Sequence, residues 1–160
     1  MSNKILGIDP GIGITGFGLI DATKRGSAKA LDFGVITTTK NAPLPGRLLE
    51  LWDSLQEVFD QTQPDVVSIE KLFFVQNITT GIAVAEARGL VLLTAAQRKI
   101  PIYEYGPKEI KLALTGYGSA NKRQMQEMVR DFLKLEKAPK PDDAADALAA
   151  AITHSLIKVI

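Results

Sequence analysis

The stretch KILGIDPGIGITGFGLID, residues 4–21, decides the fold of this 160-residue chain. Its first part is an apolar run that ends on Asp9, and its second part, residues 14–20, is rich in residues that favour strands. We therefore expect two buried strands, over residues 5–8 and 14–20, joined by a tight hairpin. The glycines of the second part leave room for a backbone or a ligand to approach Asp9.

The same stretch contains a literal G-x-G-x-x-G over residues 11–16, directly after a predicted strand. In a dinucleotide-binding fold this pattern must open a helix. Glycines at 11, 13, 16 and 18 make a poor helix, and Thr15, Phe17 and Ile20 prefer a strand. The pattern therefore favours a hairpin over a nucleotide-binding turn.

Outward from this stretch, the chain predicts a five-stranded mixed sheet with helices packed on it. A third strand lies over residues 31–36, and a helix with one apolar face ends before Pro64. A fourth strand, residues 66–69, ends at Glu70, and a fifth covers residues 101–105. We expect the first three strands to form an antiparallel meander and the later strands, which are reached through helices, to be parallel.

The remaining helices complete one α/β domain over residues 1–156, followed by a C-terminal tail at 157–160. Residues 78–99 form a long helix that is apolar on nearly all sides, which predicts burial on more than one side and a subunit interface. A short helix begins at Pro107, another is capped by Ser119, and the last runs over residues 142–156.

The composition excludes several classes of site. The chain has no cysteine and one histidine, so disulfides, thiolate metal sites, cysteine nucleophiles and histidine pairs are excluded. Its apolar runs are interrupted by residues such as Glu86, Arg88 and Thr94, so we expect no membrane span. The first residues do not resemble a signal peptide, and we expect a cytoplasmic protein.

Charge is distributed unevenly along the chain. The net charge is only 19 − 18 = +1, but residues 107–140 hold eight Lys or Arg and four acids, a local charge of 8 − 4 = +4. Aspartates at 142, 143 and 146 follow directly. A basic segment next to an acidic cluster could hold a polyanion against a metal-binding pocket. The alternative is a solvated helix surface, which has the same composition.

Four carboxylates are candidates for that pocket. Asp9 and Glu70 each end an apolar strand, and if the two strands are parallel neighbours their carboxyl ends are adjacent. Asp143 and Asp146 share a helix face, but so do Asp142 and Asp146, so spacing does not choose between Asp142 and Asp143. Oxygen ligands without cysteine suit Mg²⁺ or Mn²⁺, and a neighbouring basic surface suits two-metal phosphoryl transfer.

An ordered set of motifs along nearly the whole chain resembles the RuvC family of bacterial Holliday junction resolvases. The motifs are IDPG at 8–11, TGFG at 15–18, SIE at 68–70, EARG at 86–89, EY at 104–105, GYGSANK at 116–122 and DAADALA at 143–149. The resemblance implies an RNase H-like fold and a homodimeric endonuclease that nicks opposing strands of a four-way DNA junction. It also implies Mg²⁺ (or Mn²⁺) as cofactor, two ions in each active site, and the branch-migration complex RuvA–RuvB as a partner.

The resemblance also assigns residues. It implies that Asp9, Glu70, Asp143 and Asp146 are the metal-binding catalytic carboxylates, and so it chooses Asp143 over Asp142. The implied DNA contacts are Lys111 and Lys122 near the scissile phosphate, with Lys122 also catalytic, and Phe73, which stacks on unpaired bases. Lys108 and Arg123, close to these lysines in the chain, are further candidate DNA contacts. Phe74 is the alternative to Phe73, and His154 is expected to be structural.

Two other functions are compatible with the same residues. One is another RNase H-like nuclease, which cuts RNA–DNA hybrids or transposon ends with the same carboxylates. The other is a module that binds junctions and does not cut them. Cleavage assays on junctions and hybrids, with and without Mg²⁺, separate the three.

Overall fold

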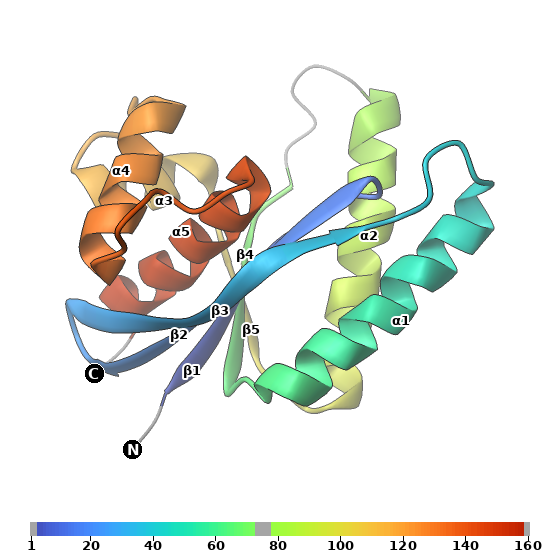
Figure 1. Ribbon diagram of the computed structural model, residues 1–160, viewed down its shortest axis with the longest axis horizontal. Coiled ribbons are helices and arrows are strands. Elements are labelled where there is room, and N and C mark those ends of the chain that lie inside the picture. Colours follow the sequence, from blue (N-terminus) through green and yellow to red (C-terminus); the bar gives the residue numbers. More distant parts are fainter. Residues whose placement is uncertain (1–2, 73–77, 159–160) are drawn as a thin grey trace.

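The computed structural model describes residues 3–72 and 78–158 and has a five-stranded mixed sheet at its centre (Figure 1). The strand order is β3-β2-β1-β4-β5, in which β1, β2 and β3 are antiparallel while β4 and β5 run parallel to β1. The predicted meander and parallel strands are thus confirmed. The strands are β1 (Lys4–Asp9), β2 (Ile14–Lys24), β3 (Ser27–Thr37), β4 (Val66–Glu70) and β5 (Ile102–Tyr105).

Helices cover both faces of the sheet. Helices α1 (Leu44–Thr62) and α2 (Ile78–Gln97) lie on one face, and α3 (Pro107–Thr115), α4 (Lys122–Leu133) and α5 (Asp142–Ile157) lie on the other (Figure 1). Each face has its own apolar core, one around Leu55 and Phe59 of α1 and the other around Leu148 and Ile152 of α5. This double cover explains why β1 and β4 are almost continuously apolar.

Helix α4 begins two residues later than expected. The predicted cap was Ser119, but the side chain of Asn121 accepts a hydrogen bond from the backbone N–H of Gln124 at 2.9 Å. The Gln124 side chain accepts one in return from the backbone N–H of Asn121, also at 2.9 Å. This reciprocal capping box satisfies two N–H groups at once, so it outcompetes the serine and makes Lys122 the first helical residue.

Three glycines on one face of β1 and β2, which we call the glycine stripe (Gly7, Gly16 and Gly18), let α5 lie directly on the sheet. A Cβ atom at Gly7 would stand 1.8 Å from the carbonyl oxygen of Ala147, and one at Gly16 would stand 2.0 Å from that of Asp143. The room expected beside Asp9 is therefore occupied by a backbone, that of α5. Consequently the first turns of α5 lie beside the end of β1.

Helix α2 is covered on one side only. Ala87, Val91 and Ala95 are fully buried against the sheet, whereas Ile82 is 50% and Leu93 48% exposed. A single chain therefore buries one side of α2, and burial of a second side in a subunit interface stays a prediction. Among the described residues α2 is also the one helix long and apolar enough to cross a membrane, with a mean hydropathy of 1.4, which the sequence argument had excluded. Such a helix is weak evidence for a span, because core helices pass the same test.

Candidate active site

The topology brings the ends of β1 and β4 together with the start of α5. Ile8 of β1 pairs with Ile69 of β4 in parallel register, so Asp9 and Glu70 leave the sheet at the same edge. Asp9 also pairs with Gly16 of β2, whose missing side chain admits the backbone of Asp143. Figure 1 shows the carboxyl ends of the parallel strands and the first turn of α5 at one end of the molecule.

Mutual repulsion shows how closely the four predicted carboxylates interact. Burial, followed by the negative charges of Asp146, Asp143 and Glu70, raises the pKa of Asp9 from 3.8 to about 7, and only Lys122 opposes this. Burial and the charge of Asp146 also raise the pKa of Glu70. Ionising these carboxylates together costs free energy, because their charges repel one another. A cation placed among them would stabilise the charged forms.

The donor chemistry of this group fits a hard divalent cation. All four candidates offer carboxylate oxygens, the ligands that Mg²⁺ and Mn²⁺ prefer. Within residues 3–72 and 78–158, no three acidic or histidine side chains already stand in positions that would hold a metal ion. To hold an ion, the side chains of the group would have to turn toward it, which their partial exposure permits.

Two hollows flank Glu70. One, of about 300 Å³, lies toward α2 and is lined by Asp9, Glu70, Arg88 and Pro107 among others. The other, of about 310 Å³, lies toward α3 and α4, and its lining includes Glu70, Asp146, Lys111 and Lys122. The negative group is thus open on two sides, and two predicted lysines line one of them.

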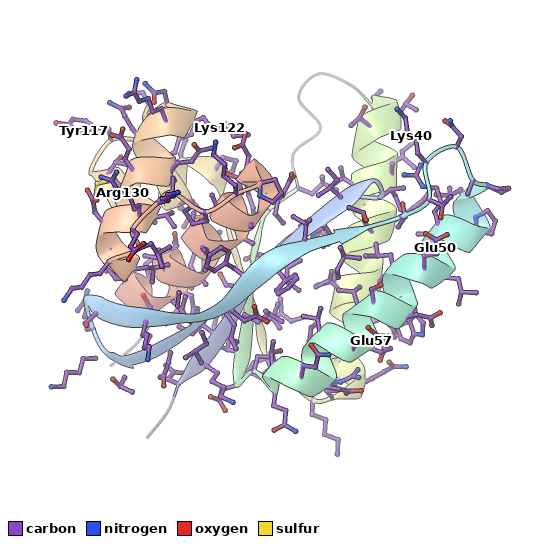
Figure 2. The ribbon with its side chains drawn as sticks, viewed as in Figure 1. Lys40, Glu50, Glu57, Tyr117, Lys122 and Arg130 are labelled. Atoms are coloured by element: carbon purple, nitrogen blue, oxygen red, sulfur yellow. The ribbon has the colours of Figure 1, made fainter. Side chains whose placement is uncertain are left out.

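The start of α5 distinguishes the two neighbouring aspartates. The Nζ of Lys122 is 3.2 Å from Oδ2 of Asp142, and Gln126 donates to the other oxygen of Asp142 at 2.9 Å. Asp142 thereby faces α4, and its hydrogen bond raises the pKa of Lys122. Asp143 instead acts on Asp9. In Figure 2 Lys122 lies at the start of α4, across the sheet from Lys40 on the α1 side.

Other predicted residues lie away from the group or outside the described part. Lys108 is exposed, Arg123 pairs with Glu127 at 3.3 Å, and neither lines either hollow. Phe73 and its alternative Phe74 lie outside the described residues. His154 is buried, and its Nδ1 is 2.8 Å from the hydroxyl of Tyr105, which is consistent with a structural role.

One contributor to the site had no role in the sequence prediction. Arg88 of α2 lines the hollow beside Asp9 and Glu70, and its Nη2 donates to Oε1 of Glu104 on β5. Both residues stood in motifs that were identified without a function. The available signal was the presence of Arg88, with Glu86, inside a helix whose other residues carry no charge, because a buried charge requires a partner.

The family model described as "Crossover junction endodeoxyribonuclease RuvC" matches residues 5–154. A protein of that description from Endomicrobium trichonymphae is 51% identical over 150 residues, which cover 94% of this chain and 79% of the relative. One from Thermomicrobium roseum is 48% identical over 151 residues, which cover 94% and 91% of the two chains.

Solved structures of junction resolvases are similar to this chain. RuvC of T. thermophilus in complex with a Holliday junction substrate superimposes with a TM-score of 0.90 at 36% identity, covering 96% of this chain and 93% of that one. The yeast mitochondrial Holliday junction resolvase matches with a TM-score of 0.67 at 17% identity, covering 96% and 79%, and at that identity it shows the fold alone. The predicted RNase H-like fold is confirmed.

Proposed function

Because this chain belongs to the RuvC family of crossover junction endodeoxyribonucleases, we propose that it resolves Holliday junctions by paired nicks in opposing strands. One observation supports the proposal most strongly: four carboxylates lie at one edge of the sheet, and their burial and mutual repulsion raise the pKa values of Asp9 and Glu70. The four are Asp9, Glu70, Asp143 and Asp146. Lys111 and Lys122 line the hollow beside them, where a phosphodiester would need positive charge.

We infer that these four carboxylates hold two Mg²⁺ ions, with Mn²⁺ as a substitute. Asp9 is the best placed to contact both ions, because it ends the central strand and interacts with the other three carboxylates. When bound, the ions activate water for attack on phosphorus and stabilise the leaving oxygen.

The protein's own residues carry the remaining work. The charge of Lys111 partly offsets the rise in the pKa of Glu70 that burial and Asp146 cause. Lys111 lines the hollow with Lys122, so both ammonium groups can neutralise charge on the phosphate. Lys122 is held by Asp142, which keeps its ammonium at the edge of the carboxylate group. Hydrolysis breaks the P–O3′ bond and leaves a 5′-phosphate and a 3′-hydroxyl.

Paired cleavage requires two sites related by symmetry, and we propose a homodimer formed through α2. The support is its exposed apolar face, which includes Ile82 and, two and three turns further along, Gly89 and Leu93. Three further parts of this proposal rest on membership of the family alone. They are the stacking of Phe73 on unpaired bases, cooperation with RuvA–RuvB and a cytoplasmic location.

A synthetic four-way junction tests the function. With Mg²⁺ the protein should produce two symmetric nicks whose products are sealed by ligase, and with EDTA it should bind the junction without cutting it. A linear duplex and an RNA–DNA hybrid of the same sequence are the controls. Equal cleavage of the hybrid, or junction binding without nicking in Mg²⁺ and in Mn²⁺, would contradict the proposal.

The raised pKa of Asp9 predicts that metal affinity depends on pH. Between its ordinary value of 3.8 and about 7 the folded chain holds a proton that the unfolded chain has lost. The stability of the metal-free protein should therefore fall as pH rises from about 4 to 7. Because Mg²⁺ requires the ionised form, its affinity should rise about tenfold from pH 6 to pH 8.

Titration calorimetry at the two pH values, with urea unfolding of the metal-free protein, measures both effects. Asp9→Asn is the control, since it should reduce the loss of stability between pH 4 and 7, leaving only the smaller part due to the raised pKa values of Glu70 and Asp146. Equal Mg²⁺ affinity at pH 6 and pH 8 would show that Asp9 is not the titrating ligand.

A further inference from the structure

We infer that Arg88 is a positioning residue for the metal site: through Glu104 it holds the β4–β5 edge of the sheet, and with it Glu70, in place beside Asp9. The inference rests on the proposed metal-dependent cleavage and adds a residue to it.

The first step is the ion pair itself. Arg88 lies on α2 and Glu104 on β5, and the two side chains are only 23% and 32% exposed. An ion pair so shielded from water holds its partners more firmly than a surface pair, and loss of one member leaves the other charge poorly solvated. The pair therefore ties α2 to the end of β5.

The second step is the position of Glu104 in the sheet. Glu104 pairs with Ile69, and the next residue, Tyr105, pairs with Glu70. The backbone N–H of Lys71 donates to the carbonyl oxygen of Tyr105 at 2.8 Å. The end of β5 thus contacts the residues on both sides of Glu70, and any displacement of β5 is passed to that carboxylate.

The third step concerns the way the end of β5 is held. The strand has four residues and lies at the edge of the sheet, where β4 is its one neighbour among the described strands, and Ile102 packs into the core on the α1–α2 face. On the face that α5 covers, the hydroxyl of Tyr105 is hydrogen-bonded to His154 of α5. The Arg88 pair supplies the matching attachment on the α2 side, so the strand end is held from both faces.

The fourth step concerns Arg88 itself. Its side chain lines the hollow that contains Asp9 and Glu70, yet the charges that shift the pKa of Glu70 are those of Asp146 and Lys111. Its Nε is buried and has no hydrogen-bond partner in the described part of the chain. A buried donor without a hydrogen-bond partner lowers the stability of the folded protein. The presence of an arginine at this position is therefore better explained by a role at the active site than by a contribution to stability.

Arg98 offers a matched control at the other end of α2. It forms an ion pair with Asp60 at 2.8 Å, is 24% exposed, and bonds to Gln56 at 2.8 Å. It lines a separate hollow with Phe59 and Pro64, away from the carboxylates. The Asp60 side chain is 70% exposed, so the Arg98 pair is open to solvent on one side. Arg88→Met and Arg98→Met therefore each remove one ion pair of an equally shielded arginine, with different relations to Glu70.

The test measures nicking of a four-way junction as a function of Mg²⁺ concentration, together with junction binding in Ca²⁺ and thermal unfolding. Arg88→Met should raise the Mg²⁺ concentration for half-maximal nicking about tenfold, the size typical of residues that support metal ligands. Junction affinity should stay within about twofold. Arg98→Met should lower the unfolding temperature without changing the Mg²⁺ dependence.

Two further variants keep the test decisive if Arg88→Met does not fold. Glu104→Gln preserves the shape of the side chain and should shift the Mg²⁺ dependence in the same direction. The double variant Arg88→Glu with Glu104→Arg exchanges the two charges. It should need less Mg²⁺ for half-maximal nicking than either single substitution alone.

Three outcomes would overturn the inference. One is a wild-type Mg²⁺ dependence in Arg88→Met and Glu104→Gln, and another is an equal effect in Arg98→Met. The third is a tenfold loss of junction affinity at unchanged Mg²⁺ dependence, which would make Arg88 a DNA contact. Failure of the wild-type protein to nick at all would instead refute the proposed function.

Discussion

Asp146→Asn should abolish junction nicking while junction binding survives. Asp146 lies one turn into α5, and its charge acts on both Asp9 and Glu70, so its replacement removes one of the four proposed metal ligands. Metal-assisted charge stabilisation contributes several kcal/mol to such reactions. A loss of about 4 kcal/mol corresponds to a rate reduction of about a thousandfold.

Single-turnover nicking in Mg²⁺ measures the loss, and gel-shift binding in Ca²⁺ shows that the junction is still bound. The matched control is Asp131→Asn on α4, because Asp131 is exposed, pairs with Arg130 at 2.9 Å and lines neither hollow beside Glu70. That variant should nick within a few-fold of wild type. Cleavage retained by Asp146→Asn, or an equal loss in Asp131→Asn, would contradict the role assigned to Asp146.

Gly7→Ala should destabilise the protein more than any exposed substitution. The added Cβ would stand 1.8 Å from the carbonyl oxygen of Ala147 and 2.9 Å from the amide nitrogen of Ala151. Both are backbone atoms of α5, so no side chain can rotate away and the helix itself must move off the sheet. We expect a loss of about 3 kcal/mol in the free energy of unfolding, the upper part of the range for overpacked cores.

Urea unfolding measures this loss, with Gly46→Ala as the control. Gly46 lies in α1 with nothing within 4 Å of its added Cβ, so alanine there should stabilise the protein by about 0.5–1 kcal/mol. Because α5 carries Asp143 and Asp146, folded Gly7→Ala should also nick more slowly. Unchanged stability in Gly7→Ala would mean that α5 does not lie as close to β1 as the structure places it.

Most of the fold was predictable because its signals are local. The apolar runs that end on Asp9 and Glu70 mark two buried strands, and the glycines after Asp9 rule out a helix at the G-x-G-x-x-G pattern. Helix boundaries were less predictable, since Ser119 and Asn121 are both competent caps. The choice between them depends on whether a reciprocal partner lies three residues on, as Gln124 does for Asn121.

The residue types in this chain were enough to indicate oxygen-ligand metal chemistry, because carboxylates at strand ends and the lack of cysteine are properties of the sequence alone. The three-dimensional arrangement decided which groups meet. The glycine stripe seats α5 so that Asp143 acts on Asp9 while Asp142 turns to Lys122, and β5 brings Glu104 to Arg88 across the sheet. Such contacts join residues far apart in the chain, and their distances depend on backbone packing that no local pattern records.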